Sequence, residues 1–162
     1  MDKQELIYGE ISPKGMKLFA KIEPEIKNFM DIGSGYGKFT WVMASFLGAD
    51  KAYGIEIDKE KWILANKHFS GKYNPNVIFE YGDFRRYKNL IKKMDVIYCN
   101  CTTWHYETVA ELADIIQPET RFYHNSSRFF YKHKELHEKL ELNVQWVKTP
   151  YNFYKLTTTF NR

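Results

Sequence analysis

The segment DIGSGYGKF carries three glycines, Gly33, Gly35 and Gly37, directly after an acidic residue, Asp31. Glycines permit tight backbone turns and let a ligand lie against the main chain. The dinucleotide fingerprint G-x-G-x-x-G binds a pyrophosphate at a helix N-terminus, but here the third glycine comes one residue early and Asp31 would repel phosphate. Asp31 can instead accept a hydrogen bond from an ammonium group, directly or through water. The loop therefore predicts a nucleoside cofactor that has an amino group and no phosphate, such as S-adenosylmethionine.

Two further positions extend this prediction along the chain. Glu56, in the segment YGIEID, stands where an acid accepts both ribose hydroxyls in nucleotide-binding sheets. Asp83, in YGDF, can accept a hydrogen bond from the adenine amino group, and Phe84 can cover the adenine ring. Each signal alone also fits a plain turn or a helix cap. Their order, one at each successive strand end, favours a bound nucleoside.

The segment YCNCTTWHYE places Asn100 at the end of an apolar run, with Trp104 four residues later. Enzymes that methylate base amines commonly have Asn-Pro-Pro-Tyr or Asp-Pro-Pro-Tyr at such a strand end. There the polar side chain accepts a hydrogen bond from the amine and the aromatic ring stacks on the base. Both prolines are missing here, which counts against a base amine as the acceptor. A strand-end cap is the structural alternative for Asn100.

Short apolar runs alternate with longer amphipathic segments, which is typical of β/α units. We expect strands in 28–33, 52–58, 76–84, 94–100 and 121–126, and helices in 38–48, 59–69, 106–116 and around 132–140. Two β-rich runs, 143–148 and 152–160, follow without a helix between them and predict an antiparallel hairpin. The fold class is therefore α/β, an open and mostly parallel sheet with an antiparallel C-terminal hairpin strand. Ligands bind outside the carboxyl ends of such strands, near the point where the strand order reverses.

Composition narrows the remaining choices. The 162 residues suit one domain, and the net charge of +4 is dispersed, so we expect no strong nucleic-acid footprint. Cys99 and Cys101 have no second Cys or His pair at zinc-ligand spacing, so we expect no metal and interpret both as buried, reduced thiols of an intracellular protein. Neither a signal-like segment nor an apolar run of membrane-spanning length occurs. We therefore expect a soluble cytoplasmic protein, or a nuclear one in a eukaryotic host.

Six segments, in this order, resemble the Dot1-like histone lysine methyltransferases, which are class I S-adenosylmethionine-dependent enzymes. They are YGEIS, DIGSGYG, YGIE, GDF, VIYCN and the C-terminal W…PYNFY, and they extend from Tyr8 to about Thr159. DIGSG with a later Glu is shared by many class I methyltransferases, whereas YGE, GDF and the terminal hairpin are more specific. The resemblance implies a single methyltransferase domain over residues 1–162, in which 1–27 cover the cofactor and 28–162 form a Rossmann-like core.

The resemblance also implies roles for individual residues. The cofactor contacts would be Tyr8 and Glu10 in a closing loop, Asp31, Gly33 and Gly35 at the methionine moiety, Glu56 at the ribose, and Asp83 with Phe84 at the adenine. Asn100 would lie near the transferred methyl group, and Trp146 and Phe153 would line a lysine channel, so these three are the predicted catalytic residues. The product of the cofactor would be S-adenosylhomocysteine. Lys38 stands where the family commonly has a Gln, and Phe153 replaces a Tyr.

A lysine ammonium must lose a proton before it can attack a methyl group. A narrow aromatic channel beside a cationic sulfonium lowers the pKa of that ammonium by desolvation and like-charge repulsion. Walls formed by Tyr98, Trp104, Trp146 and Phe153 would do this without a dedicated base, and Asn100 would orient the amine. Core packing of the hairpin is the alternative for Trp146 and Phe153.

Three functions follow from these observations. The leading prediction is an S-adenosylmethionine-dependent protein-lysine N-methyltransferase, whose partner is a protein with an accessible lysine. The second is methyl transfer to another amine, in a small molecule or a nucleic acid. The third is a non-catalytic cofactor-binding module, which the departures at Lys38 and Phe153 favour.

Overall fold

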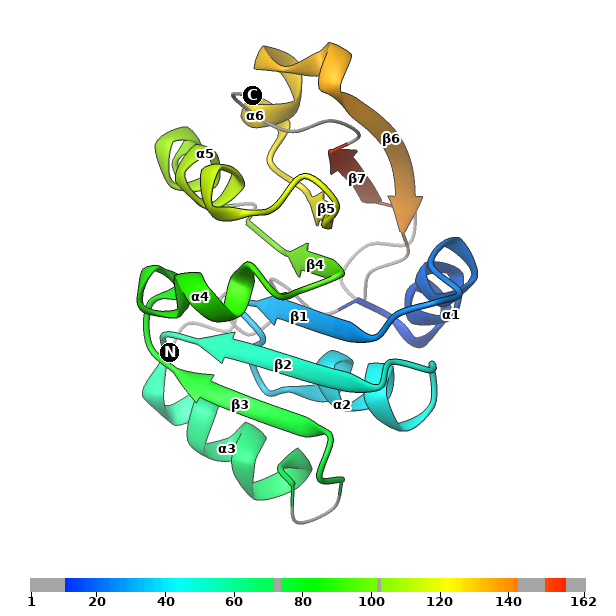
Figure 1. The fold of residues 1–162 in the computed structure, drawn as a ribbon, viewed down its shortest axis with the longest axis vertical. Helices are drawn as coiled ribbons and strands as arrows, with labels where there is room; N and C mark the ends of the chain where they lie inside the picture. Colours follow the sequence, from blue (N-terminus) through cyan, green and yellow to red (C-terminus); the bar gives the residue numbers. More distant parts are fainter. Residues whose placement is uncertain (1–10, 72–73, 102, 143–150, 157–162) are drawn as a thin grey trace.

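The computed structural model describes residues 11–71, 74–101, 103–142 and 151–156. Within these residues a seven-stranded sheet has the order β3-β2-β1-β4-β5-β7-β6 (Figure 1). The strands are β1 Asn28–Ile32, β2 Lys51–Glu56, β3 Val77–Tyr81, β4 Val96–Cys99, β5 Arg121–His124, β6 His137–Leu142 and β7 Tyr151–Leu156. Strands β1 to β5 pair in parallel, and β7 runs antiparallel to both β5 and β6. The predicted class, a mostly parallel sheet with one reversed C-terminal strand, is confirmed.

Helices connect the parallel strands in the way that β/α units require. The helical elements are α1 Pro13–Ile22, α2 Lys38–Ser45, α3 Lys59–Phe69, η1 Phe84–Tyr87, α4 Lys88–Ile91, α5 Tyr106–Ile115, α6 Ser127–Lys132 and η2 Lys134–Leu136. Local signals explain where several of them begin. Helix α3 begins after Asp58, whose side chain accepts hydrogen bonds from two backbone N–H groups of the first turn, and α1 begins with Ser12 as cap and a proline in its first turn.

Two hydrophobic clusters cover the two faces of the sheet. On one face, Met16 and Phe19 of α1 and Phe39 of α2 pack against buried residues of β1, β4 and β7. On the other face, Val109 of α5 and Phe129 of α6 pack against the alternate residues of the same central strands. Side chains alternate between the faces of a strand, so this division decides which face each predicted site residue can reach.

Helix α1 belongs to the segment 1–27, which is predicted to cover the cofactor. Its Phe19 is fully buried in the core. Glu23, which caps the end of α1, is 4% exposed and forms ion pairs with Arg121 of β5 and Lys155 of β7. An ionised carboxylate is costly to bury unless it is paired, so these contacts fasten α1 to the sheet. None of the helices within the described ranges is long and apolar enough to cross a lipid bilayer.

The prediction for residues 132–140 is wrong. The structure forms η2 there and then β6, which pairs with β7 from His137↔Leu156 to Leu142↔Tyr151. Charged residues at helical spacing suggested a solvated helix, but Leu140 and Leu142 alternate with exposed charges and pack on the α1 face. This alternation has the period of two that is typical of a strand, and the pairing with β7 selects it over the helical period. The hairpin strand predicted at 143–148 lies outside the described residues.

Candidate functional site

The loop between β1 and α2 contains the three glycines, and all have positive φ: 80° at Gly33, 56° at Gly35 and 85° at Gly37. Backbone hydrogen bonds join the loop to β2, because the N–H groups of Gly33 and Ser34 both donate to the carbonyl of Ile55, at 2.8 and 3.1 Å. A Cβ at Gly33 or Gly35 would have no atom within 4 Å, so the loop has an open side. A ligand can approach the main chain closely there.

Glu56 lies at the end of β2 and is only 7% exposed. Its two carboxylate oxygens accept backbone hydrogen bonds, one from the N–H of Gly35 at 2.7 Å and one from the N–H of Asp58 at 2.8 Å. The carboxylate therefore organises the glycine loop as well as the start of α3. Each oxygen keeps further acceptor capacity. Its predicted role at a ribose stays a prediction, because Glu56 is not among the residues that line the cavities described below.

Asp31 is buried on β1, two residues after Phe29, and therefore faces the α1 side of the sheet. Burial, and secondly the negative charge of Glu56, raise the pKa of the Asp31 carboxyl well above its usual range. Tyr98 is its in-register neighbour on β4. Two carboxyl groups in this position favour a cationic ligand over an anionic one.

A cavity of about 320 Å³ lies outside the carboxyl ends of β1, β2 and β3. Its lining residues are Ile32, Gly33, Ile55, Ile57, Gly82, Asp83, Phe84, Arg85, Thr103, Trp104, His105 and Thr108. It lies beside the position where the strand order reverses between β1 and β4, as expected for an open α/β sheet. We call it the first cavity. Gly33, Asp83 and Phe84 are the predicted cofactor residues that line it.

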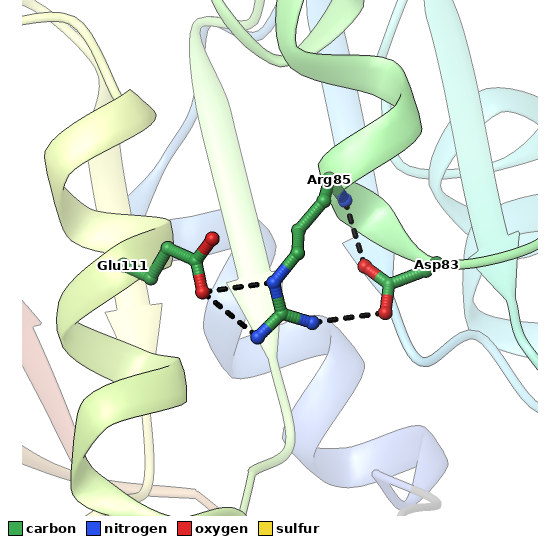
Figure 2. A network of polar contacts seen from close by, with 3 residues as sticks. All are labelled: Asp83, Arg85 and Glu111. Atoms are coloured by element: carbon green, nitrogen blue, oxygen red, sulfur yellow. Dashed lines mark hydrogen bonds and ion pairs between the residues drawn. The ribbon is translucent and has the colours of Figure 1, made fainter.

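Asp83 and Arg85, which line the first cavity, form a polar network with Glu111 (Figure 2). One oxygen of Asp83 caps η1 by accepting from the backbone N–H of Arg85 at 2.9 Å, and the other pairs with the Arg85 guanidinium at 2.9 Å. The same guanidinium reaches Glu111 of α5 at 2.8 Å. Arg85 therefore links η1 to α5, a connection that sequence analysis missed.

The aromatic side of the first cavity is formed by Phe84 and Trp104. Their rings are nearly parallel, with an interplanar angle of 12° and centroids 5.6 Å apart, and the Arg85 guanidinium carbon lies 4.8 Å from the Phe84 ring centroid. The Phe84 ring belongs to the core on the α5 face. Phe84 and Trp104 both line the first cavity and give it an aromatic surface.

A second cavity of about 270 Å³ adjoins the first and shares three of its residues. Its lining consists of Thr103, Trp104, His105, Ser126, Ser127 and Arg128, from the segments that follow β4 and β5. Among these described residues there is no acid, and Arg128 is exposed. The second cavity is therefore polar and positively charged where the first is largely apolar.

Asn100 follows β4 and is held by Asn125, which follows β5. The Asn125 amide nitrogen donates to Asn100 Oδ1 at 2.8 Å, and Asn125 Oδ1 accepts from the Cys101 N–H at 2.7 Å. Asn100 is not among the residues that line either cavity, so its role beside the methyl group stays a prediction. Asn125 was missed because no sequence motif connects it to Asn100. The available signal was that both end neighbouring parallel strands.

Of the predicted channel walls that the structure describes, Tyr98 and Phe153 lie together, whereas Trp104 lies on the other face of the sheet. Phe153 is fully buried and stacks on Tyr98, with ring centroids 5.2 Å apart, on the α1 face of the sheet. Trp104 lies against the opposite cluster, on the α5 face. Phe153 thus has a packing role, and its predicted role in a channel stays a prediction. Trp146, Tyr8 and Glu10 lie outside the described residues.

Cys99 and Cys101 are free and buried, as predicted for reduced thiols. Burial, together with a hydrogen bond to Cys101, raises the pKa of the Cys99 thiol well above its usual range, so it remains protonated. Within the described part of the chain, no group of three His, Cys, Asp or Glu side chains is arranged to hold a metal ion.

Residues 25–157 match the family model described as "Methyltransferase domain". Solved structures with the same fold include a putative caffeoyl-CoA O-methyltransferase from Staphylococcus aureus, with a TM-score of 0.68, 11% identity, and coverage of 91% of this chain and 84% of that one. An RNA methyltransferase from Salinibacter ruber in complex with S-adenosyl-L-homocysteine has a TM-score of 0.67 and 17% identity, over 93% of this chain and 94% of that one. An O-methyltransferase from Bacillus cereus in complex with the same product has a TM-score of 0.67 and 18% identity, over 90% of this chain and 81% of that one. No curated protein sequence matches the chain.

Proposed function

The chain belongs to the methyltransferase domain family, and from this premise we propose that it transfers the methyl group of S-adenosylmethionine to an acceptor that enters through the second cavity. One observation carries the proposal: the two cavities adjoin at the carboxyl ends of the strands and share Thr103, Trp104 and His105. A cofactor in one and an acceptor in the other would meet along this shared wall.

The described residues fit S-adenosylmethionine. The open side of Gly33 and Gly35 admits a ligand against the main chain, and the first cavity of about 320 Å³ falls within the range typical of small-molecule sites. Burial and Glu56 raise the pKa of the Asp31 carboxyl, and the cationic end of the cofactor would counter both effects by favouring the carboxylate form. Phe84 can cover the adenine ring, and the Asp83 carboxylate can accept a hydrogen bond from the adenine amino group. Arg85 holds the Asp83 carboxylate in place.

When bound, S-adenosylmethionine supplies an electrophilic methyl group on a sulfonium. The chain itself has to position the acceptor and exclude water, because methyl transfer needs an in-line nucleophile held close and little covalent help. Trp104 borders both cavities and would exclude water between them. Asn100 would orient the acceptor through its amide, as the sequence predicts.

The acceptor that the resemblance favours is the side-chain amine of a protein lysine, and we retain it as the first proposal. A specific observation supports a second candidate, an acceptor that carries a phosphate, as a nucleic acid does. Arg128 lines the second cavity, and none of the described residues that line this cavity is an acid, so a phosphate would be attracted and a lysine ammonium repelled. The Salinibacter ruber structure, described as an RNA methyltransferase, is consistent with this candidate.

Transfer of a tritiated methyl group from S-adenosylmethionine to a host lysate tests the proposal. Label recovered as methylated lysine after acid hydrolysis of the protein fraction supports the first acceptor, and label in nucleic acid supports the second. Arg128→Ala should reduce transfer to a phosphate-bearing acceptor and should not reduce transfer to lysine, because it removes a charge that repels the lysine ammonium. Tight binding of S-adenosylmethionine by calorimetry, with no label in protein, nucleic acid or small molecules, would indicate the non-catalytic module instead.

A further inference from the structure

The ends of β4 and β5 place two asparagine side chains against each other. Strands β4 and β5 are parallel neighbours with Cys99↔His124 as the last pair in register, so Asn100 and Asn125 follow at the same level of the sheet. Asn125 is 5% exposed. Its amide bridges the Cys101 N–H, at 2.7 Å, and Asn100 Oδ1, at 2.8 Å.

These two hydrogen bonds fix the direction of both amides. A backbone N–H can only donate, so the atom of Asn125 that faces Cys101 must be the oxygen. The other end of the Asn125 amide is then the NH₂ group, which can only donate, so the atom of Asn100 that faces it must be the oxygen. Rotating either amide by 180° would place a donor against a donor. The Cys101 backbone therefore sets the direction of the Asn100 amide through Asn125.

The main chain around Asn125 is itself restrained. The next residue, Ser126, donates its backbone N–H to His124 Nδ1 at 3.1 Å, and its hydroxyl accepts from the Phe129 N–H at the start of α6 at 3.3 Å. Ser126 also lines the second cavity. Asn125 thus has little freedom to move, and it connects the wall of the proposed acceptor cavity to Asn100.

We propose that Asn125 is a positioning residue, which sets the direction of the Asn100 amide and through it the orientation of the acceptor. The inference rests on the proposed role of Asn100 in methyl transfer. It predicts that the Asn100 side-chain amide has one orientation, in which Oδ1 accepts from Asn125. Acceptors would be selected for a group that can bind an amide held in this orientation.

Asn125→Asp tests the inference, because a carboxylate can still accept from the Cys101 N–H but cannot donate to Asn100 Oδ1. The Asn100 amide should then turn and present its NH₂ group to residue 125. Asn74→Asp is a matched control. Asn74 Oδ1 likewise accepts a backbone N–H, from Asn76, and its Nδ2 donates to Ser45 Oγ. Asn74 precedes the amino end of β3, whereas the first cavity lies at the carboxyl end of this strand. Asn125→Ser serves as a second variant if the aspartate prevents folding.

The first readout needs no acceptor. In ¹⁵N-labelled protein the Asn100 side-chain NH₂ resonances, assigned by their loss in Asn100→Ala, should shift in Asn125→Asp and stay in place in Asn74→Asp. The second readout is turnover with tritiated S-adenosylmethionine and the labelled lysate fraction. We expect kcat to fall about 10- to 100-fold, the effect of a modest misplacement of a reacting group, with an unchanged Kd for S-adenosylmethionine.

A double-mutant cycle separates positioning from general damage. If Asn125 acts through Asn100, Asn125→Asp should lower kcat no further in an Asn100→Ala background. Additive losses, or unshifted Asn100 resonances in Asn125→Asp, would overturn the inference and leave the proposed function intact. Unchanged turnover in Asn100→Ala alone would overturn both the proposed role of Asn100 and the positioning role of Asn125.

Discussion

Glu56→Gln removes one negative charge from the candidate cofactor site and keeps the size of the side chain. The wild-type carboxylate accepts two backbone hydrogen bonds, from Gly35 at 2.7 Å and from Asp58 at 2.8 Å. An amide has one oxygen, so it can satisfy one of these N–H groups and must turn its NH₂ group toward the other. The substitution therefore acts on the glycine loop and on the ribose acceptor together.

The expected loss of stability can be worked out from these two contacts. Leaving one buried N–H without an acceptor costs about 1–3 kcal/mol, and the remaining bond loses its charge assistance, which is about half its strength. Against this, the pKa of Asp31 is raised partly by Glu56, so removing that charge relieves a repulsion. We expect a net decrease of about 2 kcal/mol in the free energy of unfolding, or roughly 4–8 °C in Tm for a domain of this size.

The substitution should also weaken the binding of S-adenosylmethionine. If the ribose hydroxyls donate to the Glu56 carboxylate, losing one such bond to a charged group costs about 1.5–3 kcal/mol, which is roughly a 10- to 100-fold weaker Kd for S-adenosylmethionine. Urea unfolding measures the first effect and calorimetry the second. Glu60→Gln is the control, because Glu60 is exposed in the first turn of α3 and near Glu56 in sequence.

The two measurements can contradict the reasoning separately. An unchanged Kd in Glu56→Gln, with the expected loss of stability, would mean that Glu56 only organises the loop and that no ribose binds there. A weaker Kd with unchanged stability would mean that the two backbone hydrogen bonds contribute little to folding. Equal effects of Glu56→Gln and Glu60→Gln would mean that the measured changes reflect net charge alone.

Three further predictions concern packing, the first cavity and pH. Gly37→Ala should lower the free energy of unfolding, measured with urea, by about 2–4 kcal/mol, because a Cβ there would lie 2.5 Å from an aromatic carbon of Phe79 on β3. Gly48→Ala is the control. Gly48 has a similar φ but open space around it, so this substitution should cost only about 1–2 kcal/mol. Arg85→Ala should change stability by less than about 1 kcal/mol, as exposed ion pairs do, yet weaken S-adenosylmethionine binding several-fold in calorimetry because the Asp83 carboxylate loses its partner. Burial lowers the pKa of His124, so the folded protein holds this side chain neutral while the unfolded chain takes up a proton below a pKa of about 6.5. The free energy of unfolding should therefore decrease below this pH, by up to about 1.4 kcal/mol per pH unit. Urea unfolding at several pH values should find a smaller slope in His124→Gln.

The sequence was informative wherever a local pattern had one structural solution. The glycine loop, the capped helix after Asp58 and the buried strands were predicted within a few residues of their observed bounds, because period and capping specify them locally. The segment 132–140 failed because a charged, alternating segment is compatible with both periods until β7 provides a partner. Tertiary pairing decided that case, and no local signal carried it.

The site shows the same division between local and distant information. Asp83 and Phe84 were placed at the first cavity because their motif follows β3 directly. The link from Arg85 to Glu111 joins elements 26 residues apart, and the contact from Asn125 to Asn100 joins residues 25 apart. Such contacts depend on the strand order and register, which single residues do not encode. Phe153 was predicted at a channel by resemblance, and its position on the buried face follows from the pairing of β7 with β5 and β6.

The charged side chains beside the glycine loop discriminate between classes of cofactor. Asp31 and Glu56 lie close enough for the Glu56 charge to raise the pKa of the Asp31 carboxyl, so an ionised Asp31 is repelled by Glu56 in the free site. A dinucleotide would add a pyrophosphate to two carboxyl groups and increase this repulsion, whereas a sulfonium with an ammonium group would reduce it. The glycine loop alone is compatible with either class of ligand. Glu56 is also compatible with both classes, because dinucleotide-binding sheets have an acid at this position for the ribose. Asp31 makes the difference, and it favours S-adenosylmethionine over a nicotinamide or flavin dinucleotide.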